Sequence, residues 1–259
     1  MYKISANTSI IGKSVIYVPS CHSTNDYLNQ LISNKVIEEG TTVVTSDQTK
    51  GRGQRGNAWE CQADSNITLS CFLQPHFIEA KDQFTMNIAV SLGVYDTITS
   101  LYSSNVKIKW PNDILIDNKK ICGILIENYL SGRKISNSIV GIGLNINQTS
   151  FNGNFPATSL FIETGKKMNL NYASQLLLEN LDKRYHQLKN GEIDRLKREY
   201  YDNMFWFQEE GLFEEVNPDG TRERFNGVIL GVNDYGCISI AKENKEVKHY
   251  AFKEVKHIY

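Results

Sequence analysis

The sequence lacks several features that mark particular classes of protein. Its five cysteines are scattered and none forms a Cys-x-x-Cys pair, which argues against a disulfide framework or a structural zinc site. The five histidines are dispersed, without metal-ligand spacing. The first residues, Met1–Ser5, lack the apolar core of a signal peptide, and no apolar run approaches the roughly 20 residues that span a bilayer. We therefore predict a cytoplasmic protein with no membrane segment.

An excess of charge of either sign is also missing. The chain has 28 lysines and arginines against 29 aspartates and glutamates, a formal net charge of -1. Domains that bind nucleic acid usually carry a basic excess, so we expect no DNA partner. Hydrophobic residues make up 41% of the 259 residues. That is enough for a sizeable core in one large domain with a small companion.

Hydrophobic periodicity divides the chain into two parts. The predicted strands of the first part fall at 14–18, 42–45, 66–72, 107–110, 114–117, 121–127 and 138–146, and its predicted helices follow Ser23–Asn25 and span 84–102, 172–189 and 192–205. Beyond Trp206, short runs at 212–216, 225–230, 237–241 and 247–252 alternate with turn signals. This pattern predicts an α+β domain at 1–206 and a small barrel-like β-domain at 207–259.

A glycine-rich loop, Gly51-Arg52-Gly53-Gln54-Arg55-Gly56, follows the second predicted strand. Three glycines let a backbone approach a ligand closely, and Arg52 and Arg55 would suit phosphate or carboxylate oxygens. The loop lacks the Gly-Lys-Ser/Thr ending of a Walker loop. No convincing crossover helix and parallel strand follow it, which argues against a dinucleotide site. A bare glycine loop is more often a plain turn.

Two further segments carry candidate site residues. Lys109-Trp110-Pro111-Asn112-Asp113 precedes a predicted hairpin in which Lys120 enters an apolar strand, where its ammonium would suit an α-phosphate or a polarised carbonyl. The alternative is a solvated turn lysine, which we prefer for Lys119. Asp113 would suit Mg²⁺, although Asn-Asp after proline is also ordinary turn chemistry. In the strand Gly141–Asn147, small residues leave room for a flat ligand that Asn145 would hydrogen-bond, a weak signal alone.

Taken in order, these segments resemble the biotin–protein ligase family. The resemblance runs over essentially the whole chain, because Ser23-Thr24-Asn25, the glycine loop, Lys109–Asp113 and Lys120–Glu127 occur in series. It implies a class II synthetase-like catalytic domain with a mixed β-sheet and flanking helices, and a small C-terminal SH3-like β-barrel domain. It also implies an ATP-dependent ligase that forms biotinyl-5′-AMP, with Mg²⁺, and then biotinylates a lysine of a biotin carboxyl carrier protein or domain.

The same resemblance implies roles for single residues. By it, Lys120 and Arg52 are the catalytic residues. The residues implied to bind biotin or its adenylate are Ser23, Thr24, Asn25, Gln48, Arg52, Gly53, Gln54, Arg55, Trp59, Lys120, Gly123 and Asn145. Trp59 resembles an aromatic that closes the loop over the ligand. Asp113 is a candidate Mg²⁺ contact, and no metal ligand is assigned.

Two departures from the family pattern stand out. Relatives often carry arginine where this chain has Gln54, so the adenylate would be held less firmly here. About twenty residues precede Ser23, too few for the helix-turn-helix repressor module of some relatives, so we expect no repressor role. The glycine loop and 147–157 are expected to close over the ligand. A lipoate–protein ligase and a non-catalytic biotin sensor are the alternatives, and the protein is expected to be a monomer or a homodimer.

Overall fold

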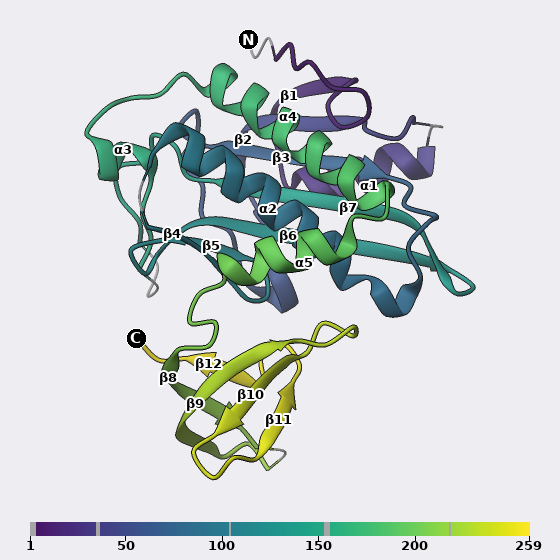
Figure 1. Ribbon diagram of the computed structural model, residues 1–259. Helices are drawn as coiled ribbons and strands as arrows, with labels where there is room; N and C mark the ends of the chain where they lie inside the picture. The colour runs from purple at the N-terminus through teal and green to yellow at the C-terminus, as the bar shows by residue number, and fades with distance from the viewer. Residues whose placement is uncertain (1–3, 35–36, 104, 153–155, 218) are drawn as a thin grey trace.

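A computed structural model describes residues 4–34, 37–103, 105–152, 156–217 and 219–259. It contains two sheets, of seven and five strands (Figure 1). The larger sheet has the order β1-β2-β3-β7-β6-β5-β4. Its strands are β1 (Val15–Cys21), β2 (Thr42–Gln48), β3 (Ile67–Leu73), β4 (Val106–Lys109), β5 (Asp113–Ile116), β6 (Lys119–Ser131) and β7 (Lys134–Leu144).

The larger sheet is mixed. Strands β1 and β2 are parallel, and the helix α1 (Thr24–Asn34) forms the crossover that a parallel pair needs. All other neighbouring strands in this sheet are antiparallel. Strand β3 therefore returns antiparallel to β2 after the glycine loop, so the loop does not open a parallel β-α-β unit. This agrees with the sequence-based argument against a dinucleotide site.

Helices cover both faces of the larger sheet, and the alternation of side chains in the strands explains how. In β2, Val43 packs with Leu28 of α1, whereas the next residue, Val44, belongs to the main core on the other face. That second face is covered by α2 (Phe84–Leu101), α4 (Leu170–Lys189) and α5 (Ile193–Asp202), which lie in front of the sheet in Figure 1. The short helices are η1 (Gln54–Gly56), η2 (Ala80–Asp82) and α3 (Leu160–Thr164).

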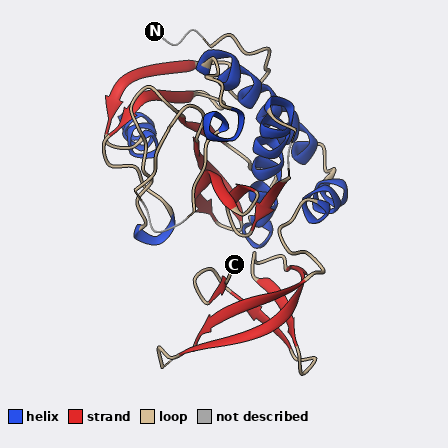
Figure 2. Cartoon of the chain, turned by 90° about the vertical axis from the view of Figure 1, so that its left-hand side faces the viewer, coloured by secondary structure: helices blue, strands red, loops and turns tan. Residues whose placement is uncertain are grey.

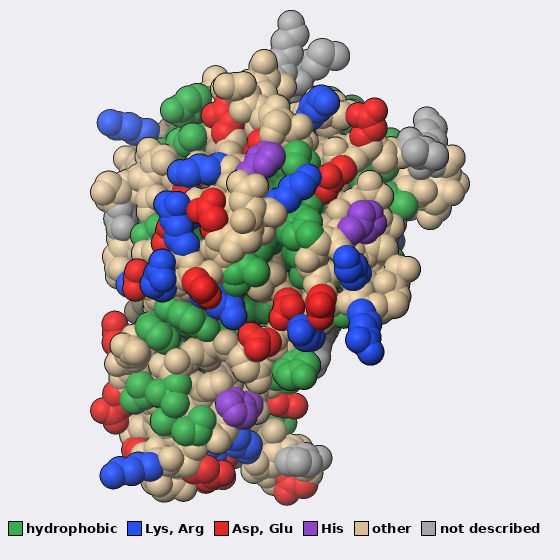
Figure 3. Space-filling view, turned by 45° about the vertical axis from the view of Figure 1, so that its right-hand side comes forward, with side chains coloured by type: hydrophobic (Ala, Val, Ile, Leu, Met, Phe, Trp, Pro, Cys, Tyr) green, Lys and Arg blue, Asp and Glu red, His purple; other side chains and the backbone are tan. Residues whose placement is uncertain are grey.

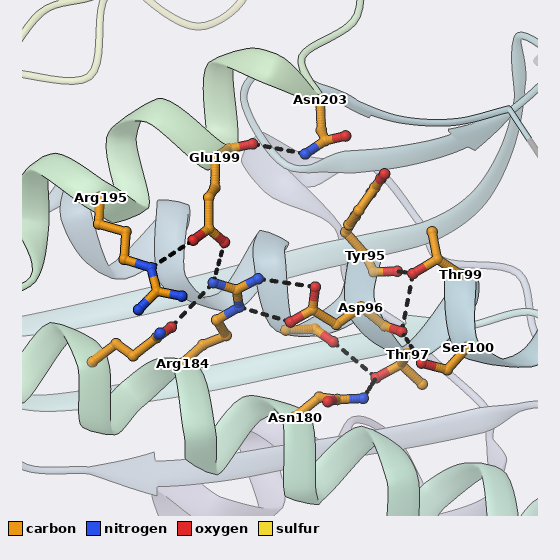
Figure 4. A network of polar contacts seen from close by, with 12 residues as sticks. Tyr95, Asp96, Thr97, Thr99, Ser100, Asn180, Arg184, Arg195, Glu199 and Asn203 are labelled. Carbon is orange, nitrogen blue, oxygen red and sulfur yellow. Dashed lines mark hydrogen bonds and ion pairs between the residues drawn. The ribbon is translucent and has the colours of Figure 1, made fainter.

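An ion-pair network ties the three covering helices together (Figure 4). The guanidinium of Arg184 in α4, whose side chain is 8% exposed, donates to both carboxylate oxygens of Asp96 in α2, at 2.7 and 3.0 Å. It also pairs with Glu199 in α5 and donates to Gln187. Glu199 accepts a further bond from Arg195 at 2.8 Å. Buried charge is tolerated here because each group has partners.

The smaller sheet has the order β11-β10-β9-β8-β12 and lies beyond one end of the larger one (Figures 1 and 2). Its strands are β8 (Glu210–Val216), β9 (Arg222–Val232), β10 (Ile238–Lys242), β11 (Val247–Tyr250) and β12 (Val255–His257). The indole of Trp110 donates to the carbonyl of Gly236 at 3.0 Å, and Lys109 donates to the hydroxyl of Tyr259 at 3.1 Å. These bonds join the segment after β4 to the smaller sheet.

The predicted fold class is confirmed: a mixed sheet with flanking helices precedes a small C-terminal β-sheet. The sequence-based prediction missed α3 and β12, which span five and three residues and are too short for a periodic signal. None of the described helices has the length and apolar character needed to traverse a bilayer. On the face shown in Figure 3, positive and negative side chains are interspersed.

Candidate active site

A cavity of about 850 Å³ lies where the two sheets meet. In the larger sheet and its helices, its walls come from the start of α1, the end of β2 with the glycine loop, β3, the β4–β5 segment and the glycine-bearing strands β6 and β7. The smaller sheet adds the end of β8, the start of β9 and the region of β12. The predicted site residues that line it are Ser23, Thr24, Asn25, Gln48, Arg52, Gly53, Gln54, Trp59, Asp113, Lys120 and Gly123. Segments nearly 240 residues apart in sequence thus surround one space.

The start of α1 supplies a cradle of neutral polar groups. The Thr24 backbone N–H donates to Gln48 Oε1 at 2.9 Å, and the Ser70 hydroxyl lies 2.7 Å from Thr24 Oγ1 and 2.5 Å from Asn25 Oδ1. Ser23, Thr24 and Asn25 are each only 3% exposed. Fixed, buried donors and acceptors of this kind select a small uncharged polar ligand by hydrogen bonding.

Three glycines on adjacent strands form the floor of the cavity. Gly123 in β6 and Gly143 in β7 are directly paired, and Gly141 lies two residues before Gly143. A Cβ added at Gly141 would lie 2.2 Å from Asn25 Oδ1. The floor therefore admits no side chain, as expected for strand glycines over which a ligand or another group passes closely.

The indole of Trp59 lies on this floor. A Cβ added at Gly143 would come within 2.3 Å of the indole, and one at Gly123 within 2.8 Å. The indole N–H is buried and has no hydrogen-bond partner among the described residues. Lys120 Nζ lies 5.5 Å from the ring centroid, within cation–π range.

Arg52 is held by two carboxylates. One terminal nitrogen lies 2.8 Å from Asp26 Oδ1 and 2.9 Å from Glu127 Oε2. Glu127 also accepts from Asn25 Nδ2 at 2.7 Å, so the loop arginine is linked to the polar cradle. An isolated antiparallel β-bridge between the backbones of Arg52 and Ala58 holds the two sides of the loop together.

Lys120, Lys109 and Asp113 form a charged part of the cavity wall. Lys120 Nζ forms an ion pair with Asp113 Oδ1 at 2.6 Å. Lys109 is 8% exposed. Its pKa is lowered to about 8 overall: burial lowers it, the negative charge of Asp113 partly offsets this, and the positive charge of Lys120 lowers it by a smaller amount. Burial likewise lowers the pKa of His257 to about 3, so this cavity-lining imidazole is neutral at pH 7.

The charges on the cavity wall are strongly unbalanced in a chain whose net charge is -1. One acidic residue, Asp113, lines the cavity, against six cationic ones: Arg52, Lys109, Lys120, Arg222, Lys253 and Lys256. Sequence reasoning missed the last three, which come from the smaller sheet and its loops. Isolated basic residues in a β-rich tail gave no local signal that would have found them.

Of the remaining predicted residues, one stands apart from the cavity wall and the side chain of the other is not described. Asn145, 2% exposed, is not among the lining residues; its Nδ2 donates to the Thr158 carbonyl at 3.0 Å. The Arg55 side chain lies outside the described part of the structure, as do residues 153–155 of the predicted loop at 147–157. No cluster of three or more potential metal ligands occurs among the described residues. Asp113 is thus the single carboxylate on the cavity wall.

The fold and the cavity define an α+β protein that suits a ligand with an uncharged polar end and an anionic end. Residues 17–145 match the model of the biotin/lipoate A/B protein ligase family. The chain is 30% identical over 257 residues to the bifunctional ligase/repressor BirA of Bacillus spizizenii, an alignment that covers 96% of this chain and 76% of that protein. It is also 30% identical over 172 residues to the biotin–[acetyl-CoA-carboxylase] ligase of Mycobacterium tuberculosis, covering 65% and 62% of the two.

Solved structures show the same relationship. The biotin protein ligase from Aquifex aeolicus, in complex with biotin and ATP, superposes with a TM-score of 0.77 at 25% identity, covering 95% of this chain and 99% of that one. The chain belongs to the biotin/lipoate A/B protein ligase family, among its biotin–protein ligases. The resemblance seen in the sequence motifs is thereby confirmed.

Proposed function

We propose that this enzyme forms biotinyl-5′-AMP from biotin and ATP in the cavity between the two sheets, and transfers biotin to a specific lysine of a biotin carboxyl carrier protein or domain. The observation that carries the proposal is the polarity of the cavity. A neutral hydrogen-bonding cradle at Ser23–Asn25 suits the uncharged ureido ring of biotin, and the cation-rich end suits a triphosphate.

In the first step, a carboxylate oxygen of biotin attacks the α-phosphorus of ATP. The new bond is the acyl–phosphate bond, and the bond to pyrophosphate breaks. Lys120 lies at the cationic end, where its ammonium would neutralise charge on the carboxylate and α-phosphate oxygens. To do so, Lys120 must break its ion pair with Asp113 and contact the substrate instead. We propose that Arg52 also neutralises charge on the carboxylate and α-phosphate oxygens, after its ion pairs with Asp26 and Glu127 have broken.

In the second step, the ε-amine of a carrier lysine attacks the acyl carbon of the mixed anhydride. The amide bond forms, AMP leaves with the electron pair of the broken bond, and the amine loses a proton. Lys120 would stabilise the developing oxyanion in this step also. Retention of the adenylate between the steps falls to the loop residues Gly53, Gln54 and Trp59, which line the cavity.

Magnesium is part of the proposal because Mg²⁺ commonly binds through one or two carboxylates together with substrate phosphates. Asp113 is the residue that would contact it, since it is the acidic residue on the cavity wall. Bound there, Mg²⁺ would offset the negative charge of the triphosphate. Asp113 would then no longer be available to pair with Lys120, as it does in this structure.

The proposal includes the division of the chain. Residues 1–206 would form the catalytic domain and residues 207–259 the small β-domain, which contributes the cations Arg222, Lys253 and Lys256 to the site. We keep the expectation of no repressor role, and of a monomer or homodimer. Gel-shift assays with operator DNA and sedimentation in the presence of biotin and ATP test these points.

The direct test is to incubate the protein with biotin, ATP, Mg²⁺ and a biotin carboxyl carrier domain. The mass of the carrier domain is then measured by mass spectrometry. We expect the mass to increase by one biotinyl group, and no increase with lipoate. Lipoylation without biotinylation would indicate the lipoate-ligase alternative. Binding of biotin without any transfer would indicate a biotin sensor.

A further inference from the structure

The glycine floor has an occupant in this structure. The indole of Trp59 lies in direct contact with Gly123 and Gly143, closely enough that even a methyl group on either glycine would clash. These glycines are paired across adjacent strands, so the indole covers the part of the floor that has no side chains. A bicyclic substrate ring lying on the same glycines would need the volume that the indole fills.

Several contacts hold the indole in place. The Trp59 backbone N–H donates to the Gly51 carbonyl at 2.9 Å, and the Gly53 N–H to the Asn57 carbonyl at 2.7 Å, so the loop is closed at both ends. Arg52 fastens the loop to α1 and β6 through Asp26 and Glu127. The ammonium of Lys120 lies over the indole.

The indole is nevertheless incompletely satisfied in this position. Its N–H is buried without a hydrogen-bond partner among the described residues. Buried indole N–H groups normally find an acceptor. Departure of the indole would therefore satisfy this group and at the same time free the glycine floor and one face of Lys120.

We infer that Trp59 is an internal plug: in the ligand-free enzyme its indole occupies the seat on Gly123 and Gly143, and biotin can bind only after the indole has moved away. This inference rests on the proposed function, since it names the occupant that competes with the biotin ring. The plug contacts Lys120 as well as the floor, so the seat and the reacting end of the cavity become available together. In the enzyme without biotin, the indole then also shields Lys120, the proposed catalytic lysine.

The kinetics of biotin binding test the plug. Association of radiolabelled biotin is followed by rapid filtration with wild-type enzyme and with Trp59→Ala. For the wild type, the observed rate should level off with biotin concentration, because opening becomes limiting. For Trp59→Ala it should rise linearly, with an association rate constant about ten-fold higher if a tenth of the wild-type molecules are open.

Glu60→Ala is the matched control. Glu60 is the exposed neighbour of Trp59 and accepts hydrogen bonds from Asn152, so its removal loosens the same segment without emptying the seat. We expect its association rate constant to stay within about two-fold of wild type. An equal or lower rate constant for a folded Trp59→Ala that still binds biotin overturns the plug. Failure of the wild type to bind biotin in calorimetry overturns the proposed function instead.

A second measurement uses the wild-type protein, so it tests the plug even if Trp59→Ala does not fold. In protein labelled with 5-fluorotryptophan, the Trp59 resonance is identified by its loss in Trp59→Phe. We expect its fluorine shift to be insensitive to exchange of H₂O for D₂O without ligand, and to become sensitive when biotin saturates the site. A lid that only closes over biotin predicts the reverse order, and that result contradicts the plug.

Discussion

Two clusters of charged residues in this molecule follow opposite rules. In the helical layer, Arg184 is surrounded by Asp96, Glu199 and Gln187, so the guanidinium is matched by carboxylates from two other helices. On the cavity wall, six cationic residues face a single acidic one. The first arrangement balances its charges among the three helices, whereas on the cavity wall cations outnumber the acidic residue, although Arg52 and Arg222 also pair with carboxylates outside the wall.

The difference teaches how to separate structural from functional charge. Removing a member of the helical cluster leaves an uncompensated buried charge and should cost stability. Removing a cation from the cavity wall removes a charge that would contact an anionic substrate and should cost activity instead. Replacing a lysine or arginine is therefore expected to cause a different kind of loss in each region.

The largest expected effect is that of Lys120→Ala on catalysis. We expect the rate of carrier biotinylation to fall about 1,000-fold, since the variant loses a cation aimed at charge that develops in the transition state. The thermal unfolding midpoint should be nearly unchanged. Initial rates of biotin transfer, measured by mass, and a melting curve on the same preparation check both points.

Lys119→Ala is its matched control. Lys119 adjoins Lys120 but pairs with Glu163 at 2.6 Å and is not among the cavity-lining residues. Its biotinylation rate should stay within about two-fold of wild type. Equal losses in the two variants would contradict the assignment of Lys120 as the catalytic lysine.

The next largest effect is that of Arg184→Ala on stability. The variant leaves Asp96 and Glu199 without their shared partner in the interface of α2, α4 and α5, so we expect a loss of about 3 kcal/mol in the free energy of unfolding. Below the unfolding transition, the KM for biotin should not change. Urea denaturation and steady-state assays at low temperature measure the two quantities.

Arg195→Ala provides the comparison, because Arg195 contacts the same Glu199 but its side chain is 55% exposed. Exposed ion pairs contribute little to stability, so its denaturation curve should nearly overlay that of the wild type. If Arg184→Ala behaved like Arg195→Ala, the helical cluster would not be the structural element we describe.

Much of the fold and part of the site could be predicted from the sequence, because both are encoded locally. The alternation in the strands and the spacing of apolar residues in α2 and α4 fix those elements without reference to the rest of the chain. The same holds for the glycine loop and for Lys120 after its turn. The structure places both at the cavity, while their roles remain proposals.

The remaining features depend on contacts between distant segments. Arg52 meets Asp26 and Glu127, which are separated from each other by a hundred residues, and Trp59 meets a glycine of β7. Arg222, Lys253 and Lys256 reach the cavity through the docking of the smaller sheet. Local periodicity carries no information about such docking, so neither the plug nor the full set of cations could be predicted.

Glu215 in the smaller sheet extends the comparison to a buried carboxylate. Burial alone would raise its pKa, but hydrogen bonds from Lys242, Lys248 and Tyr250 lower the pKa to about 2. Because the folded pKa lies below the ordinary value of 4.5, its contribution to stability is present above pH 4.5 and is lost as the pH falls toward 2. Glu215→Gln should therefore lose roughly 2 kcal/mol at pH 7.

The pH dependence distinguishes this structural charge from a purely steric effect. The difference in stability between Glu215→Gln and wild type should narrow steadily from pH 5 to pH 2, in denaturation curves recorded across that range. A difference that stays constant over the range would show that packing, and not the charge on Glu215, accounts for the loss.

The smallest expected effect is that of Gln54→Arg, a substitution that adds a charge to the cavity wall. Gln54 lines the cavity as a neutral side chain at a position where the resemblance in sequence implies arginine, so under the proposed function the loop would make one charged contact fewer to the adenylate. Reactive adenylate should therefore escape and label lysines of a bystander protein. Gln54→Arg should reduce this labelling by roughly three- to ten-fold, equivalent to about 1 kcal/mol of added retention.

The assay compares biotin incorporated into serum albumin with biotin incorporated into the carrier domain, by mass, at equal carrier turnover. Equal bystander labelling by both enzymes would mean that adenylate retention does not depend on charge at this position, and that the loop holds its intermediate by closure alone.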